Sequence, residues 1–114
     1  MNISLRCWDE DKKQMEYRDA ETIFKFGWPL VATRNFKVML STNLLDKNGK
    51  EIFEGDICKV GHAQELCEIR YQGAAFVFEN KLGQMLVSDH HAICEIIGNI
   101  YENPSLLKPE EGKV

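Results

Sequence analysis

The sequence has 114 residues, of which 44% are hydrophobic and 28% are charged, and its formal net charge is -4. This length and composition predict one ordinary globular domain that needs no disulfide or metal to fold, rather than a disordered chain. The negative charge argues against a general nucleic-acid binder.

The N-terminal segment MNISLRCWDED lacks the basic start and apolar stretch of a signal peptide, so we expect a cytoplasmic protein. The longest apolar runs, such as AAFVF, are far too short to span a bilayer, and we expect no membrane partner. Apolar and polar residues alternate over residues 2–8, which predicts a half-buried strand. The polar cluster at 9–13 predicts a turn, and residues 14–17 a returning strand.

Residues 18–35 show no clear pattern, because Gly27-Trp28-Pro29 interrupts whatever element precedes it. Between residues 25 and 50 there are five basic residues and one acid. Basic and aromatic residues alternate there, and single-strand binders use such side chains to hold phosphates and bases. The alternative is that the aromatic residues serve the core and the cations a solvated face. The candidate contact residues, for nucleic acid or for a protein partner, are Lys25, Trp28, Arg34, Lys37 and Lys50.

From residue 36 onward the sequence consists of short alternating segments separated by Gly, Asn or Asp. We expect strands at 36–41, 51–53, 56–60, 66–72, 74–79, 84–88 and 92–102. Strands of this length, with no amphipathic helix of three turns, predict a mainly β fold: a small barrel or sandwich of short antiparallel strands with little helix. We expect residues 1–103 to form this single domain and residues 104–114 to form a turn and a flexible tail.

The stretch LLDKNGKEIFEGDICKV, residues 44–60, concentrates acidic side chains and first suggests a calcium loop. An EF-hand loop that began at Asp46 would need an oxygen ligand at its fifth position and a glycine at its sixth. The sequence has Lys50 and Glu51 there. An ammonium group repels the ion, so the loop does not match the motif.

A catalytic pair of carboxylates, Glu54 and Asp56, is the second interpretation of this stretch. Such pairs work when burial or proximity separates their pKa values, and nothing in the sequence indicates burial. We therefore interpret the stretch as two structural turns, one at Asn48-Gly49 that closes a hairpin and one at Gly55-Asp56. We expect Asp56 to be solvated and to accept hydrogen bonds from local backbone amides.

The four cysteines form no CxxC pair, and the alternation of Cys58 and Cys67 within strands predicts free thiols in the core. No nucleophile elbow or oxyanion element accompanies them, so we expect neither enzyme activity nor a cofactor. Zinc needs four converging ligands, which this spacing does not favour. The residues that leave a metal site open as an alternative are Cys58, His62, Cys67, His90, His91 and Cys94.

Three segments resemble the YopX family of small phage and prophage proteins: ISLRCWDEDKKQMEY, LLDKNGKEIFEGDICKV and EIIGNIYENPSLL. They follow the order of the family pattern, which has an arginine-x-tryptophan-aspartate opening, a DKNG turn followed by EGDIV, and a closing IGNIYENPEL. Asn43 stands where the family usually has glycine, and Asn also tolerates the left-handed region. Cys58 stands where the family often has valine, which supports an apolar role for this thiol.

The resemblance implies a mobile-element origin, a mostly β fold and self-assembly into a homo-oligomer. It implies no enzyme activity, because the family is one of unknown function. The leading hypothesis is a non-enzymatic accessory protein that assembles with itself or binds a phage or host protein. The alternative is a small β-barrel that binds nucleic acid through the basic and aromatic region 24–50.

Overall fold

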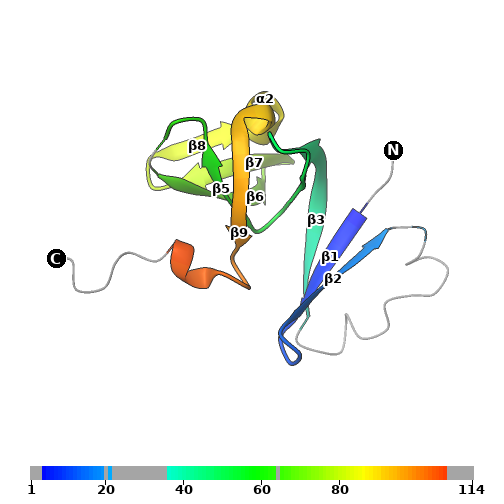
Figure 1. Cartoon of the computed structure of the whole chain (residues 1–114). Helices are drawn as coiled ribbons and strands as arrows, with labels where there is room; N and C mark the ends of the chain where they lie inside the picture. Colours follow the sequence, from blue (N-terminus) through cyan, green and yellow to red (C-terminus); the bar gives the residue numbers. More distant parts are fainter. Residues whose placement is uncertain (1–3, 20, 22–35, 64, 108–114) are drawn as a thin grey trace, which may run out of the picture.

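The chain forms two antiparallel sheets in a computed structural model that describes residues 4–19, 21, 36–63 and 65–107. The first sheet has the strand order β2-β1-β3-β4 and the second the order β8-β7-β6-β5-β9. Figure 1 shows the second sheet with the short helix α2 at one end, and β3 between this sheet and the hairpin of β1 and β2. The prediction of a mainly β fold is confirmed.

The first sheet consists of β1 (Ser4–Asp9), β2 (Gln14–Asp19), β3 (Phe36–Leu45) and β4 (Glu51–Phe53). The strand β3 extends past the predicted end at residue 41, because it pairs with two neighbours in succession. Its first half lies opposite β1, and its second half lies opposite β4. Within the second pairing the register shifts between Ser41 and Leu45, and there Asn43 has a φ of 62°, in the left-handed region that its family position predicted.

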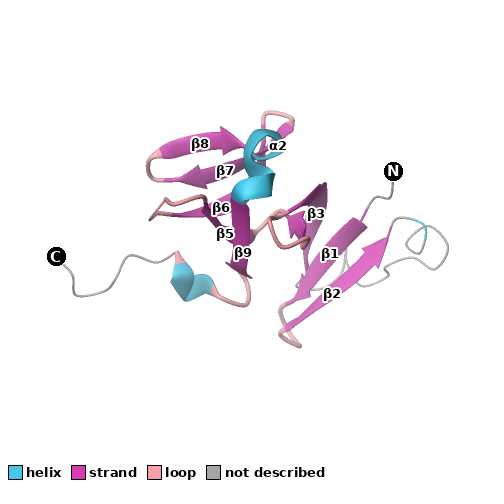
Figure 2. Cartoon of the chain, turned by 45° about the horizontal axis from the view of Figure 1, so that its top comes forward, coloured by secondary structure: helices cyan, strands magenta, loops and turns pink. Residues whose placement is uncertain are grey.

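The second sheet consists of β5 (Asp56–Val60), β6 (Leu66–Gln72), β7 (Ala75–Asn80), β8 (Gly83–Leu86) and β9 (Cys94–Asn99). The bounds of β4, β5 and β6 agree with the sequence prediction. The strand predicted at 84–88 instead ends at Leu86, and α2 (Val87–His90) follows because the Val87 side chain turns into the core, where it is fully buried. Two short 3-10 turns follow, η1 (His91–Ile93) and η2 (Pro104–Leu106), as Figure 2 shows.

The main core lies on the second sheet, and residues of β4 and α2 pack against it. Its buried members are Ile52, Cys58, Val60, Cys67, Ile69, Phe78, Val87 and Cys94. The three cysteines in this set are free thiols, as predicted. A hydrogen bond with Cys94, together with burial, raises the pKa of the Cys58 thiol, so it stays protonated at neutral pH. In the described part of the chain, no helix has the length and apolar character needed to cross a membrane.

Candidate functional site

The predicted contact residues that the structure describes do not share one patch. Lys37 lies near the start of β3, and Lys50 follows the turn at the other end of that strand; both are exposed. At the usual rise per residue of a strand, roughly 25 Å separates these positions. Lys25, Trp28 and Arg34 lie outside the described residues.

The turn predicted at Asn48-Gly49 joins β3 to β4, and Gly49 has the positive φ of 81° that this turn requires. Asp46 begins the turn and is buried. One oxygen of its carboxylate accepts from the amides of Asn48 and Lys50, both at 2.9 Å, and the other accepts from the amide of Ile96 in β9 at 3.0 Å. Burial alone would raise the pKa of Asp46, but these three N–H groups lower it. The carboxylate of Asp46 thus links the turn to β9.

The turn at Gly55-Asp56 differs from the prediction in its exposure. Asp56 does accept a local amide, from Phe53 at 2.8 Å, but only 2% of the residue is exposed. The expectation of a solvated carboxylate was wrong, because Arg6 from the start of the chain pairs with Asp56 at 2.8 Å inside the protein. Burial raises the pKa of the Asp56 carboxyl, and the Arg6 guanidinium acts in the opposite direction.

The guanidinium of Arg6 makes several further contacts within the chain. Besides Asp56, it donates to the Glu54 carbonyl oxygen at 3.1 Å and to the Met39 sulfur at 3.3 Å. Its carbon lies 4.9 Å from the centroid of the Phe53 ring, which adds a cation–π contact. These contacts hold β1 against the second sheet and commit all three nitrogens of the guanidinium to partners within the chain.

The third family segment meets the first two at the same place. A Cβ on Gly98 would lie 2.5 Å from the Asn103 side-chain oxygen, so the close approach requires glycine. The Asn99 side-chain oxygen accepts from the amides of Tyr101 and Glu102, at 3.0 and 2.8 Å. The Tyr101 ring in turn stacks on Trp8 of β1, with 6.0 Å between the ring centroids.

A polar cleft of about 480 Å³ lies at this junction, beside Arg6, Tyr17, Asp56 and Asn99. Its polar side chains bind one another: Arg6 pairs with Asp56, and the Asn99 amide donates to Glu102 at 2.7 Å. Among the described residues, no buried side-chain nitrogen or oxygen lacks a hydrogen-bond partner. The cleft therefore has the character of a structural junction rather than of a binding site.

Comparisons with known proteins identify the family of the chain. The family model described as YopX protein matches residues 21–108. The chain belongs to the YopX family. Among solved structures, protein EF1440 from Enterococcus faecalis is 26% identical with a TM-score of 0.63, over 93% of this chain and 98% of that one. Protein yopX from Bacillus subtilis is 21% identical with a TM-score of 0.65, over 95% of this chain and 100% of that one. No curated protein matches the chain.

The three segments by which the YopX resemblance was first identified therefore have a structural explanation. Arg6 comes from the first segment, Asp46 and Asp56 from the second, and Asn99 from the third, and all four make their contacts at the junction between the sheets. In this chain these four residues hold the two sheets together. They provide no evidence for a chemical activity.

The histidines and cysteines do not form a metal centre in the described part of the chain, where no three His, Cys, Asp or Glu side chains converge on one point. Cys58, Cys67 and Cys94 lie in the core, whereas His62 is exposed in the loop after β5. The His91 ring nitrogen lies 2.8 Å from the Leu45 carbonyl oxygen, so this ring links η1 to the end of β3.

The open edges of the two sheets offer a different kind of candidate site. Of the four edge strands in the described sheets, β2 carries three charges in QMEYRD, which discourage further pairing. β4 is three residues long, and its Phe53 amide is bound to Asp56. On β9, the Cys94 carbonyl accepts from the Lys47 amide at 2.9 Å, and the Ile96 amide donates to the Asp46 carboxylate.

The fourth edge, β8, has no such protection. Its sequence, GQML, contains no charge, and its residues are all exposed. Three large apolar side chains gather there: Leu82, just before the strand, is 76% exposed, Leu86 is 45% exposed and Met85 is 37% exposed. One contact reaches this strand from α2, where the His90 ring lies 3.3 Å from the Leu86 carbonyl oxygen. An uncharged, apolar edge is one that pairs readily with another strand.

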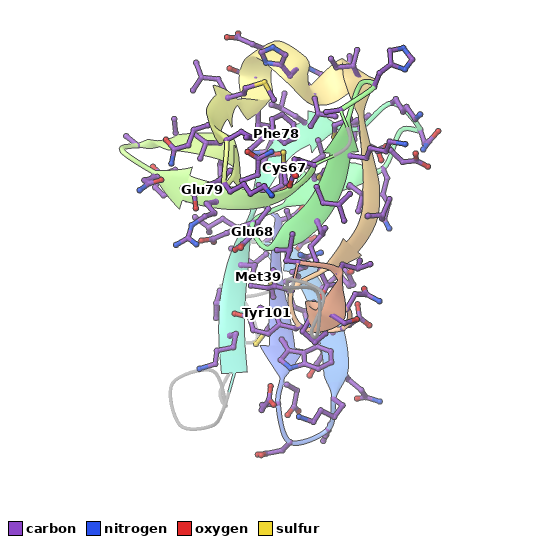
Figure 3. The ribbon with its side chains drawn as sticks, turned by 90° about the vertical axis from the view of Figure 1, so that its left-hand side faces the viewer. Met39, Cys67, Glu68, Phe78, Glu79 and Tyr101 are labelled. Carbon is purple, nitrogen blue, oxygen red and sulfur yellow. The ribbon has the colours of Figure 1, made fainter. Side chains whose placement is uncertain are left out.

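An apolar hollow of about 520 Å³ opens beside this edge, over Cys67, Phe78 and Met85. Figure 3 shows Cys67 and Phe78 together in the upper part of the molecule, away from Met39 and Tyr101 near the junction. Phe78 and Met85 are cross-strand partners, so they share one face of the sheet. Together the hollow and the β8 edge, hereafter the β8 site, form the candidate functional site of the protein.

Acidic side chains mark the opposite face of the same strands. Glu68 and Glu79 are cross-strand partners in β6 and β7, and both lie within 4 Å of Arg70, at 3.9 and 3.5 Å. Burial raises the pKa of Glu68, which Arg70 partly offsets. This arrangement is an ion-pair network on the sheet surface, and its charges are partnered.

Sequence reasoning identified the strand of the β8 site but not its position in the sheet. A local signal was available: GQML is uncharged and lies between the turn residue Lys81 and the polar residues after Val87. Only the strand order shows that this segment is an edge.

Proposed function

We propose that the chain is a non-enzymatic protein-interaction module that contacts its partners through the β8 site. The observation that carries the proposal is the contrast among the four described edges, of which β8 alone is uncharged and bordered by exposed apolar side chains. Free edges of this kind recruit strands from other chains, and proteins that do not use them cover or charge them. The partners we propose are phage or host proteins and, as the family resemblance implies, further copies of the chain.

The test of this proposal compares two variants in capture and mass experiments. Leu82→Ser removes the most exposed apolar side chain of the β8 site, and Leu45→Ser removes an exposed leucine (52% exposed) at the end of β3. We expect wild type and Leu45→Ser to retain the same proteins from phage-infected cells and to have the same mass by light scattering. Leu82→Ser should retain fewer proteins from the cells, have a lower mass by light scattering, or both. Identical behaviour of all three chains would contradict the proposal.

The nucleic-acid alternative receives no specific support from the described residues. Lys37 and Lys50 lie at opposite ends of β3, and the remaining candidate residues are outside the described part. Titration with labelled single-stranded DNA at two salt concentrations tests it, because phosphate contacts must weaken as salt rises.

A further inference from the structure

We infer that the β8 site binds an extended, uncharged peptide segment of another protein as an additional antiparallel strand, with an apolar side chain of that segment in the hollow. This inference rests on the proposed function and specifies its ligand. It follows from the main chain of β8, from the lining of the hollow, and from the small size of the site.

The main chain of β8 supplies the pairing groups. β8 is bonded to β7 along Val77–Leu86, Phe78–Met85, Glu79–Gln84 and Asn80–Gly83. In an antiparallel pair, alternate residues direct their amide and carbonyl groups away from the neighbour, toward the position of the next strand. Since β8 ends the sheet, a peptide can accept and donate hydrogen bonds there without displacing a strand.

The hollow determines which side chains the peptide must carry. Ile69, Phe78 and Met85 form one cross-strand row, so this face of the sheet continues from the core to the edge. Successive side chains of a strand point to opposite faces. Every second side chain of an added strand would therefore project on the same face as Met85, toward the hollow.

The polar groups around the hollow are already partnered, which favours an uncharged ligand. The Asn80 amide donates to the Cys67 sulfur at 3.3 Å, and its side-chain oxygen accepts from the Leu82 amide at 2.8 Å. The Glu65 carboxylate pairs with Lys81 at 3.3 Å. A charged side chain placed here would lose water without gaining a free partner, whereas an apolar side chain is stabilised by burial.

The size of the site favours a short segment over a second folded copy. β8 has four residues, so it pairs with a segment of about 13 Å. The hollow, at about 520 Å³, lies within the range of small-ligand pockets. A stable interface between folded proteins needs about 800 Å² from each partner. Two exposed apolar side chains on one short strand, with a third just before it, offer much less.

The experiment uses the full isotope-labelled chain and a capped heptapeptide of alternating threonine and leucine. We expect the peptide to shift the backbone amide signals of Gln84, Met85 and Leu86, and a peptide of alternating threonine and glutamate to leave them unchanged. Methylation of alternate peptide amides in one register should abolish the shifts, and methylation in the other register should preserve them. Equal loss or equal retention in the two registers would overturn strand pairing.

Two variants with similar original exposure complete the design. Met85→Glu places a carboxylate at the hollow, whereas Ile97→Glu places one on β9, the other edge of the same sheet; these side chains are 37% and 40% exposed. We expect peptide affinity to fall at least tenfold in Met85→Glu and to stay within twofold in Ile97→Glu. Because a charge at Met85 can also destabilise the fold, Leu82→Ser provides a second variant, at a side chain that is 76% exposed, and it should also weaken binding.

The outcomes separate this inference from the proposed function. Suppose the peptide causes no shift, while the β8 amides shift with protein concentration and Leu82→Ser suppresses that change. A second copy would then be the occupant, which overturns the peptide inference and leaves the proposed function intact. If neither the peptide nor concentration affects β8, and capture from cells is unchanged in Leu82→Ser, both fail.

Discussion

The junction between the sheets and the β8 site differ in how completely their interactions are satisfied. At the junction, Arg6 and Asp56 are almost fully buried, and each of them contacts several partners within the chain. At the β8 site, large apolar side chains are exposed beside a strand with a free edge. Charge and identifying motifs thus belong to the first region, and capacity for new contacts belongs to the second.

This difference teaches where to look for function in a family defined by its motifs. A buried ion pair whose hydrogen bonds are complete has little to offer a ligand, however prominent its residues are in the sequence. The absence of charges on an edge strand does not stabilise the fold. The other described edges of this protein carry charges or have backbone groups that are already bound, whereas β8 carries no charge. The following substitutions break or sharpen the comparison.

The largest effect is expected at the junction, from Asp56→Asn. The substitution leaves the Arg6 charge buried without its countercharge, so we expect a loss of about 3 to 5 kcal/mol in the free energy of unfolding. Urea denaturation at neutral pH measures it. The double variant Arg6→Met with Asp56→Leu removes both charges and should lose much less than the sum of the single changes. A loss below about 1 kcal/mol for Asp56→Asn would show that the pair is not a structural anchor.

Asp46→Asn should have a smaller effect that depends on pH. Its three amide contacts favour the ionised carboxylate, and we expect a loss of about 1.5 to 3 kcal/mol at neutral pH. Because folding lowers the pKa of Asp46, its stabilisation is complete above about pH 4, the ordinary value, and disappears as the pH falls below it. The stability gap between wild type and variant should therefore narrow in acid. Asp89→Asn, at an exposed side chain, is the control and should give no such gap.

Gly98→Ala tests the close packing of the third family segment. The added methyl group meets Asn103 and Leu106, so we expect a loss of about 1 to 3 kcal/mol, measured by thermal unfolding. Combining it with Asn103→Ala relieves the nearest clash. The double variant should consequently cost less than the two single changes together.

The smallest effect on stability is expected at the β8 site. Leu82→Ser changes a side chain that is mostly hydrated, so the free energy of unfolding should stay within about 0.5 kcal/mol of wild type. Binding of partners should fall nonetheless. A large loss of stability with unchanged binding would reverse the roles assigned to the two regions.

Local patterns account for most of what could be predicted from the sequence. DICKV and LCEIRYQ alternate cleanly between turn residues, and the structure has strands with those same bounds. The prediction was wrong at Val87, where burial in the core diverts the chain into a short helix that no local pattern indicates. The burial of Asp56 was missed for a similar reason, since its partner Arg6 lies on a strand of the other sheet.

The candidate site was less predictable than the fold. Basic residues near one another in the sequence suggested a contact surface, but Lys37 lies near the start of β3 and Lys50 lies after the turn at the other end of that strand. The exposed leucines of the β8 site resembled core residues, because hydrophobicity alone does not distinguish an edge strand from a central one. Strand order is a long-range property that only the folded chain reveals.

The rates at which a reagent labels the buried thiols can measure how each part of the fold opens. Cys7 reports on the first sheet, and Cys58, Cys67 and Cys94 report on the second. Burial, with Glu16 and Asp9 nearby, raises the pKa of Cys7 to about 11, so a labelling reagent reaches a reactive thiolate only after the chain opens. Equal labelling rates for Cys7 and for the cysteines of the second sheet would mean that the two sheets unfold as a single cooperative unit. Unequal rates would mean that they open as two separate units.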